Sequence, residues 1–214
     1  MRILRLPGVF RPRSDTWLLA AVLRDRPELP GGDALDLCTG SGALAIAAAL
    51  GGARSATAVD VSRRAVLTAR LNARLNGVRV DARRGSLFAA VPGRRFDVIV
   101  SNPPYLPGEA PPTHGSGRHT EAGATGRVLL DRLIDAAPAH LRPGGVLLVT
   151  HSSVNGEDAT LERMHAAGLS PEVAVRRRGA LGPLLAARAP ELEARGLLAP
   201  GERTEELLVV AGAA

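Results

Sequence analysis

Short apolar runs alternate with helical runs along the chain from about residue 34 onward. Runs of this kind predict buried strands when turn residues flank them. Strands that alternate with helices are typical of a parallel sheet covered on both faces. The sequence therefore predicts one α/β domain with a seven-stranded, mostly parallel sheet, whose strands cover residues 34–37, 56–59, 79–82, 96–101, 146–150, 172–176 and 206–210.

The predicted helices fill the intervals between these strands. Ser62 is suited to cap a helix that runs to Asn76, because its hydroxyl can accept from a free backbone N–H, and Asn-Gly then ends that helix. The other predicted helices cover residues 42–50, 126–140 and 157–167. At 214 residues the chain has the size of a single domain.

Charge and composition exclude several classes of protein. No apolar run approaches the ~20 residues that cross a bilayer, and the first residues lack the apolar region of a signal peptide, so we expect a cytoplasmic protein. The single cysteine, Cys38, and five histidines show no zinc-ligand spacing, so we expect no metal. The net charge of +6 is carried by arginine without lysine, and we interpret it as a solvated basic surface rather than a nucleic-acid face.

A glycine loop follows the first predicted strand, in the stretch Asp36-Leu-Cys-Thr-Gly-Ser-Gly. Gly40 and Gly42 permit a tight turn and close approach of a ligand, although the same glycines also satisfy the relaxed dinucleotide pattern. Asp36 favours a different ligand, because its carboxylate would repel a pyrophosphate but suits the amino group and sulfonium of S-adenosylmethionine. We therefore predict an S-adenosylmethionine site that includes Asp36, Thr39, Gly40 and Gly42.

Two further strand ends add residues to this predicted site. Asp60 ends the second strand, where a carboxylate can accept hydrogen bonds from both ribose hydroxyls, and Val61 follows it. After the third strand, Ser86 is placed to bind the adenine amino group and Leu87 to contact the ring. These residues indicate an adenosyl ligand without distinguishing a methyl donor from a nucleotide.

Asn102-Pro-Pro-Tyr, directly after an apolar strand, is the predicted reaction centre. A planar nitrogen is a poor nucleophile because its lone pair is delocalised. The Asn102 side-chain oxygen and the Pro103 carbonyl can accept from its two N–H bonds, since the two prolines hold the backbone extended. Tyr105 supplies a face for stacking. We predict Asn102, Pro103 and Tyr105 as catalytic, Asn102 as a further cofactor contact, and Asn102, Pro103, Pro104 and Tyr105 as the substrate-binding residues.

Two segments are predicted to act as lids. A helix over residues 14–23, with Ser14 as its cap and Asp15 in its first turn, should lie across the cofactor mouth as part of a segment 1–30 that is not an independent domain. Residues 31–214 would then form the methyltransferase domain. The Gly- and Pro-rich segment 106–127 is too long for an ordinary connection, and we expect a mobile substrate lid there.

Taken together, these residues resemble the class I methyltransferases, and more narrowly the protein-glutamine N5-methyltransferases that modify the Gly-Gly-Gln tripeptide of peptide-chain release factors. The resemblance is carried by residues 9–17, 36–42, 58–62, 102–105 and 205–210. The start looks most like the short eukaryotic and archaeal branch of that family. The resemblance implies a Rossmann-like fold, a place for Thr16 near the carboxylate of the methyl donor, and a small zinc-binding activator protein that covers an exposed strand edge.

The favoured acceptor is a glutamine side-chain amide of a protein such as a release factor. The alternative is an amino methyltransferase that acts on an adenine or guanine exocyclic amine of a nucleic acid, or on a small molecule. One Trp, one Tyr and three Phe provide few walls for an extruded base, which favours the peptide. A catalytically silent scaffold subunit is disfavoured by the intact Asn102 and Asp36.

Overall fold

The computed structural model describes residues 1–108 and 122–214, and within them seven strands form one sheet in the order β3-β2-β1-β4-β5-β7-β6. Neighbouring strands from β3 to β5 run parallel, whereas β7 runs antiparallel to both β5 and β6. The predicted seven-stranded, mostly parallel sheet is thereby confirmed. The strands are β1 (Asp33–Leu37), β2 (Ser55–Asp60), β3 (Asp81–Arg84), β4 (Phe96–Ser101), β5 (Leu141–Ser152), β6 (Ser170–Ala180) and β7 (Thr204–Ala213).

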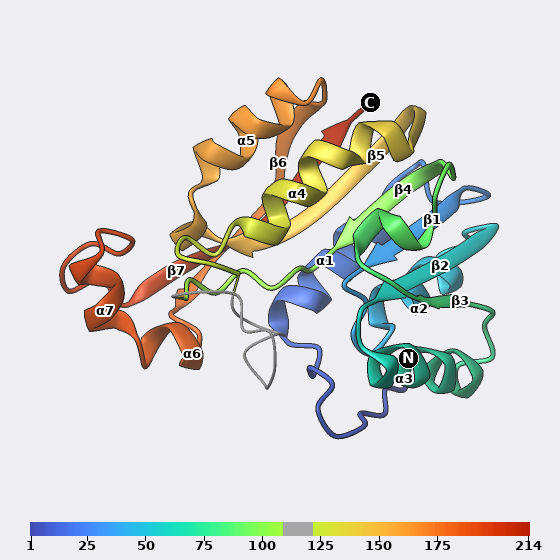
Figure 1. Cartoon of the computed structure of the whole chain (residues 1–214), viewed down its shortest axis with the longest axis horizontal. Helices are drawn as coiled ribbons and strands as arrows, with labels where there is room; N and C mark the ends of the chain where they lie inside the picture. The colour runs from blue at the N-terminus through green and yellow to red at the C-terminus, as the bar shows by residue number, and fades with distance from the viewer. Residues whose placement is uncertain (109–121) are drawn as a thin grey trace.

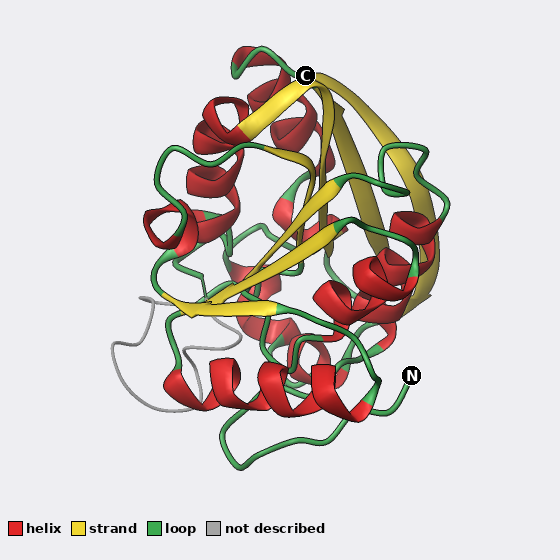
Figure 2. Cartoon of the chain, turned by 90° about the vertical axis from the view of Figure 1, so that its right-hand side faces the viewer, coloured by secondary structure: helices red, strands yellow, loops and turns green. Residues whose placement is uncertain are grey.

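Helices cover both faces of the sheet, as Figures 1 and 2 show. The α-helices are α1 (Ser14–Arg24), α2 (Ala43–Leu50), α3 (Arg63–Leu75), α4 (Val128–Ala136), α5 (Glu157–Ala166), α6 (Pro183–Ala186) and α7 (Ala189–Ala194). Three 3₁₀ turns are η1 (Leu87–Ala90), η3 (Ala137–His140) and η4 (Ser153–Asn155). These counts refer to the described part of the chain.

The two hydrophobic clusters on opposite faces of the sheet arise because successive side chains along a strand point to alternate faces. Leu35 and Leu37 of β1 point to the face where α4 and α5 pack, in a cluster with Leu133 and Met164. Ala34 belongs to the opposite cluster, with residues of α1 and α2. Strands buried on both faces need continuous apolar runs, which is why the pattern predicted β4 at its observed bounds.

Two parts of the sequence prediction need correction at the ends of the sheet. The third strand is not the apolar run 79–82 but Asp81–Arg84, because it pairs in register with the carboxyl-terminal half of β2 up to Asp60. The strand is consequently a charged edge strand. The short helices α6 and α7, between β6 and β7, were not predicted, and they pack into a small separate cluster around Leu185 and Leu192.

The first helix also differs from the prediction. Ser14 is its first residue and not its cap, since Arg13 occupies the N-cap and makes no side-chain capping bond. Leu19 and Leu23 are fully buried, and the helix packs against α2 and β5. One face of the helix is therefore part of the core, and its predicted role as a lid over the cofactor stays a prediction. The domain limits at residues 30 and 31 stay a prediction, and most of the predicted substrate lid, residues 109–121, lies outside the described residues.

Candidate active site

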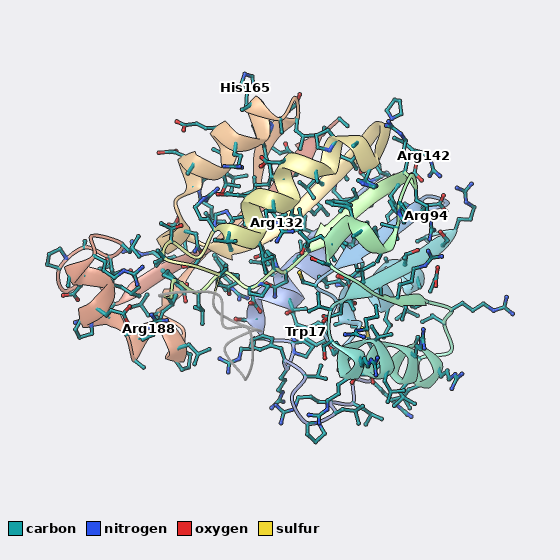
Figure 3. The ribbon with its side chains drawn as sticks, in the orientation of Figure 1. Trp17, Arg94, Arg132, Arg142, His165 and Arg188 are labelled. Atoms are coloured by element: carbon teal, nitrogen blue, oxygen red, sulfur yellow. The ribbon has the colours of Figure 1, made fainter. Side chains whose placement is uncertain are left out.

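A cleft of about 1020 Å³ opens at the carboxyl ends of β1, β2 and β4, where open α/β sheets bind their ligands. The N-terminal segment, the glycine loop and the turn before η1 form its walls. Figure 3 shows Trp17, which follows Thr16 in α1, on this side of the molecule, and Arg142 well away from it. The predicted site residues that line the cleft are Thr16, Thr39, Gly40, Asp60, Val61, Ser86, Leu87, Asn102 and Pro104.

The glycine loop presents its backbone to this cleft. Gly40 has a φ of +53°, and a Cβ placed there would meet nothing nearer than the Cys38 carbonyl oxygen at 4.0 Å, so the space beside it is open. The Gly40 N–H donates to one carboxylate oxygen of Asp60 at 2.9 Å, and the Ser62 N–H donates to the other at 2.9 Å. These two bonds fix the Asp60 carboxylate at the wall of the cleft.

Two predicted cofactor residues, Asp36 and Gly42, do not line the cleft. A Cβ on Gly42 would come within 2.9 Å of the Ala69 Cα, so this glycine permits close packing of α2 on α3. Asp36 is 1% exposed and accepts from the Thr39 hydroxyl and from the Ala45 N–H at 3.0 Å. Both residues therefore support the conformation of the loop from the side away from the cleft.

The Asp36 carboxyl is electrostatically unusual. Its Oδ1 atom is buried and has no hydrogen-bond partner among the described residues. Burial raises the pKa of Asp36 to about 7, although the Thr39 hydroxyl and the Ala45 N–H oppose this rise and Asp60 adds to it. A buried carboxyl with one free oxygen behind the loop favours a cationic group that binds on the cleft side of the loop.

A second, smaller pocket of about 130 Å³ adjoins the cleft. It is lined by the 102–106 loop, residues of α6, the start of α1 and the first half of β7. Phe10, Arg13, Asn102, Pro104 and Leu184 line both cavities, so the two meet at the Asn-Pro-Pro-Tyr loop. Pro103 and Tyr105, by contrast, line the smaller pocket alone.

A hydrogen-bond chain sets the orientation of Asn102. Its Nδ2 donates to the Thr16 hydroxyl oxygen at 3.0 Å. The Thr16 hydroxyl and backbone N–H donate in turn to Asp15 Oδ1, at 3.3 Å and 2.6 Å. Because the amide nitrogen of Asn102 is taken by Thr16, its Oδ1 is directed to the other side and is available as an acceptor.

Asp15 also fixes Tyr105. The Tyr105 hydroxyl donates to Asp15 Oδ2 at 2.8 Å. Burial, and then the charge of Asp15, raise the pKa of Tyr105 well above its usual value, so its hydroxyl stays protonated and remains a donor. One buried carboxylate at the start of α1 therefore positions both polar side chains of the Asn-Pro-Pro-Tyr loop.

The backbone of this loop is held from the opposite side. Asn155 Nδ2 donates to the Tyr105 carbonyl oxygen at 2.6 Å, and Arg127 donates to the Asn155 carbonyl at 2.8 Å. Gly126 is required here, because a Cβ on it would lie 2.1 Å from the Tyr105 carbonyl oxygen. The loop is thus rigid on the side away from the cleft.

The N-terminal segment is tied to α3 by two asparagines one helical turn apart. Asn72 accepts from the Leu4 N–H at 2.8 Å and donates to the Leu4 carbonyl at 3.0 Å, and Asn76 does the same for Arg2 at 2.7 Å in each direction. The side chains thereby pair with the segment as a neighbouring strand would. This anchoring places residues 8–13 along the wall of the cleft.

Sequence reasoning missed Asp15, Asn155 and Glu205 as site residues. Asp15 was predicted only to stabilise the helix dipole, although it stands next to Thr16 in the segment that carried the resemblance. Glu205 opens another of those segments, yet nothing in its neighbours indicates a pocket. Asn155 gives no signal at all, since it follows β5 in an ordinary polar turn.

The sequence and fold match known methyltransferases. The family model of the methyltransferase small domain matches residues 1–168. A putative protein N5-glutamine methyltransferase of Methanocaldococcus jannaschii is 36% identical over 172 residues, which cover 79% of this chain and 85% of that protein. A release factor glutamine methyltransferase of Bordetella pertussis is 38% identical over 167 residues, which cover 72% of this chain but only 60% of that protein.

Solved structures show the same fold at lower identity. The structure of the E. cuniculi Mtq2–Trm112 complex superimposes with a TM-score of 0.67 at 21% identity, covering 96% of this chain and 98% of the matched chain. The T. thermophilus 16S rRNA N2 G1207 methyltransferase, solved with AdoMet and guanosine, gives 0.60 at 22% identity, covering 100% of this chain and 49% of that one.

The matched family and its relatives, together with the cleft at the strand ends, identify an S-adenosylmethionine-dependent methyltransferase. The chain belongs to the methyltransferase small domain family, in which it is similar to the protein N5-glutamine methyltransferases. The site fits the cofactor in two respects. The space at Gly40 leaves room for a ligand against the backbone, and the free Asp36 oxygen lies behind a loop that a cationic group would approach.

Proposed function

We propose that this enzyme methylates the side-chain amide nitrogen of a glutamine in a protein of the release-factor type. The observation that carries the proposal is the position of Asn102 between the cofactor cleft and the smaller pocket, with its amide nitrogen held by Thr16. The similarity to glutamine methyltransferases of M. jannaschii and B. pertussis supports the choice of acceptor.

The cleft residues would hold the methyl donor along the glycine loop. Thr39 and Gly40 would contact it from the loop, Asp60 the ribose hydroxyls, and Val61, Ser86 and Leu87 the adenine side of the cleft. Thr16 would contact its carboxylate, and Asp36 and Gly42 would support the loop. In this description residues 31–214 form the methyltransferase domain, and residues 1–30 complete its cleft.

The smaller pocket would receive the glutamine side chain. Asn102 Oδ1 and the Pro103 carbonyl would accept from the two N–H bonds of the amide, which draws the nitrogen lone pair out of conjugation and toward the cleft. Pro104 and Tyr105 would hold the planar group between them. Catalysis then consists mainly of positioning for in-line displacement.

When bound, S-adenosylmethionine supplies an electrophilic methyl group on a sulfonium. Asn102 Oδ1 and the Pro103 carbonyl would hold the amide nitrogen in line with that methyl group, and the methylated nitrogen would release one of its two protons to water. The carboxylate of Asp15 acts on this step only by orienting Thr16 and Tyr105.

Methyl transfer from tritiated S-adenosylmethionine to a Gly-Gly-Gln-containing release factor tests the proposal. We expect label on the glutamine, and a loss on the order of a hundred- to a thousand-fold in turnover for Asn102→Ala, because one positioned hydrogen bond to the reacting group is removed. Cofactor affinity should change little. Label in the nucleic acid of a lysate, removed by nuclease and not by protease, would contradict the glutamine acceptor and favour an exocyclic amine.

We further propose a small zinc-binding activator protein as partner, in line with the similarity to the structure of the Mtq2–Trm112 complex. β3 is an edge strand of the sheet, and strand pairing at such an edge is a common mode of association. Arg70 already donates to the Ala82 carbonyl at 2.7 Å, so a partner strand would have to displace this guanidinium. Full methyl transfer by the purified chain alone, unchanged by a Trm112-type protein from the same genome, would refute the partner.

A protein that acts on translation factors would work in the cytoplasm, and we propose this location. Among the helices in the described ranges, 1–108 and 122–214, none combines the length and the apolar character required to cross a membrane. Cell fractionation with an antibody against the chain tests the location, and recovery in the membrane pellet would contradict it.

A further inference from the structure

The smaller pocket contains a carboxylate whose second oxygen is unpaired. Glu205 is 8% exposed, is the second residue of β7, and lines the smaller pocket together with residues of α6. Its Oε1 accepts from the Gly182 N–H at 2.7 Å. Its Oε2 is buried and has no hydrogen-bond partner in residues 1–108 and 122–214.

A free buried carboxylate oxygen in a pocket wall indicates a ligand contact. A buried carboxylate oxygen without a hydrogen-bond partner costs more folding free energy than an unpaired neutral polar group. We therefore expect such an oxygen where a bound molecule can donate a hydrogen bond to it. Leu106, Leu184 and Leu207 form apolar walls of the same pocket, and they strengthen a hydrogen bond made there by excluding water.

The other polar groups of the pocket narrow the choice of ligand. Asp15 is already engaged by Tyr105 and Thr16. The guanidinium of Arg13, which also lines the pocket, lies over the Phe10 ring at 5.6 Å from its centroid. Asn102 Oδ1 and the Pro103 carbonyl are acceptors, and under the proposed function both N–H bonds of the glutamine amide go to them. The next donors that a peptide brings are its backbone N–H groups.

We infer that Glu205 Oε2 accepts a backbone N–H of the acceptor peptide, either that of the methylated glutamine or that of a residue directly beside it. The inference rests on the proposed function and adds a specificity determinant to it. Proline is thereby excluded at the contacted position.

The test uses glutamine peptides in which the backbone N–H groups around the glutamine are replaced one at a time by ester oxygens. We expect one replacement to lower kcat/KM of the unmodified enzyme about 10- to 100-fold, since a hydrogen bond to a charged acceptor is lost. Glu205→Gln keeps an oxygen for the Gly182 N–H and turns the second position into a donor. This variant should lower kcat/KM for the all-amide peptide by a similar factor, by raising KM. Its kcat/KM should be the same for the all-amide peptide and for the ester peptide.

Glu206→Gln is the matched control, because this neighbour forms an ion pair with Arg176 at 4.0 Å and does not line the pocket. It should retain both the rate and the ester sensitivity. If the unmodified enzyme treats every ester peptide like the amide, or if Glu205→Gln stays ester-sensitive, Glu205 only holds Gly182 and the inference is wrong. Failure to methylate any glutamine peptide, with S-adenosylmethionine still bound, would instead overturn the proposed function and the inference with it.

Discussion

Replacement of Thr16 by valine tests two roles of its side chain, namely the orientation of Asn102 and the proposed contact to the carboxylate of the methyl donor. Valine has the shape of threonine but lacks the hydroxyl that accepts from Asn102 Nδ2 at 3.0 Å and donates to Asp15 Oδ1 at 3.3 Å. The backbone N–H of residue 16 would still donate to Asp15. The substitution therefore leaves Asp15 and Tyr105 in place, and it removes the contact that fixes the amide orientation of Asn102 together with any hydroxyl contact to the carboxylate of the methyl donor.

The size of the effect follows from these bonds. The bond from Asn102 is of normal length, whereas the one to Asp15 is long, so the loss is close to that of a single neutral hydrogen bond, about 0.5–1.5 kcal/mol. Asn102 can then turn its NH₂ group toward the substrate amide. In that orientation it presents a donor and cannot accept a hydrogen bond from the N–H groups of the amide. We expect kcat to fall about 2- to 12-fold, far less than for loss of the Asn102 side chain itself.

Single-turnover methyl transfer together with calorimetric titration of S-adenosylmethionine measures the two roles independently. Positioning predicts a lower kcat, a dissociation constant within about three-fold of the unmodified enzyme, and no further loss when Thr16→Val is added to Asn102→Ala. A weaker dissociation constant with unchanged kcat would show that Thr16 serves the donor carboxylate alone. Additive losses in the double variant would also refute the reasoning.

Two further predictions concern the cofactor side. Asp60→Ala should weaken S-adenosylmethionine binding by about 1–3 kcal/mol in calorimetry, because charge-assisted bonds to the ribose are lost, and an unchanged dissociation constant would contradict that contact. Burial raises the pKa of Asp36 to about 7, so the folded protein keeps a proton that the unfolded chain releases near pH 4, and stability falls as pH rises between these values. The fall is at most about 4 kcal/mol, and urea unfolding of Asp36→Asn without cofactor should lack it; identical pH profiles would disprove the shift.

The parts of the fold that sequence could predict are those with strong burial. β4 was predicted at its bounds because Val98, Ile99 and Val100 are buried on both faces. β3 was displaced by two residues because its own side chains are charged, and only pairing with β2 selects them. The helices α6 and α7 comprise four and six residues, too few to show a helical period, and depend on their contact with each other.

For the site, topology decided which residues could be predicted. Gly40 and Asn102 follow parallel strands and Asp60 ends one, and parallel strands bring their carboxyl ends together, so their meeting was foreseeable. Asp15 and Tyr105 are separated by 90 positions, and no local pattern indicates that they pair. Glu205 reaches the pocket only because β7 runs antiparallel to β5, a register that the sequence of β7 alone does not specify.

The buried polar atoms that lack partners in the described residues share one location. They are Asp36 Oδ1, His151 Nε2, Asn155 Oδ1 and Glu205 Oε2. Asp36 and His151 stand one residue before the ends of β1 and β5, Asn155 lies just after β5, and Glu205 is the second residue of the antiparallel β7. All four therefore gather at the end of the sheet where the two cavities open. Each unpaired group costs about 1–3 kcal/mol of folding free energy, so a fold selected for stability alone would eliminate them or spread them out. Of the four, only Glu205 lines a cavity, and under our inference its free oxygen is satisfied when the acceptor binds, whereas Asp36, His151 and Asn155 line neither the cleft nor the smaller pocket.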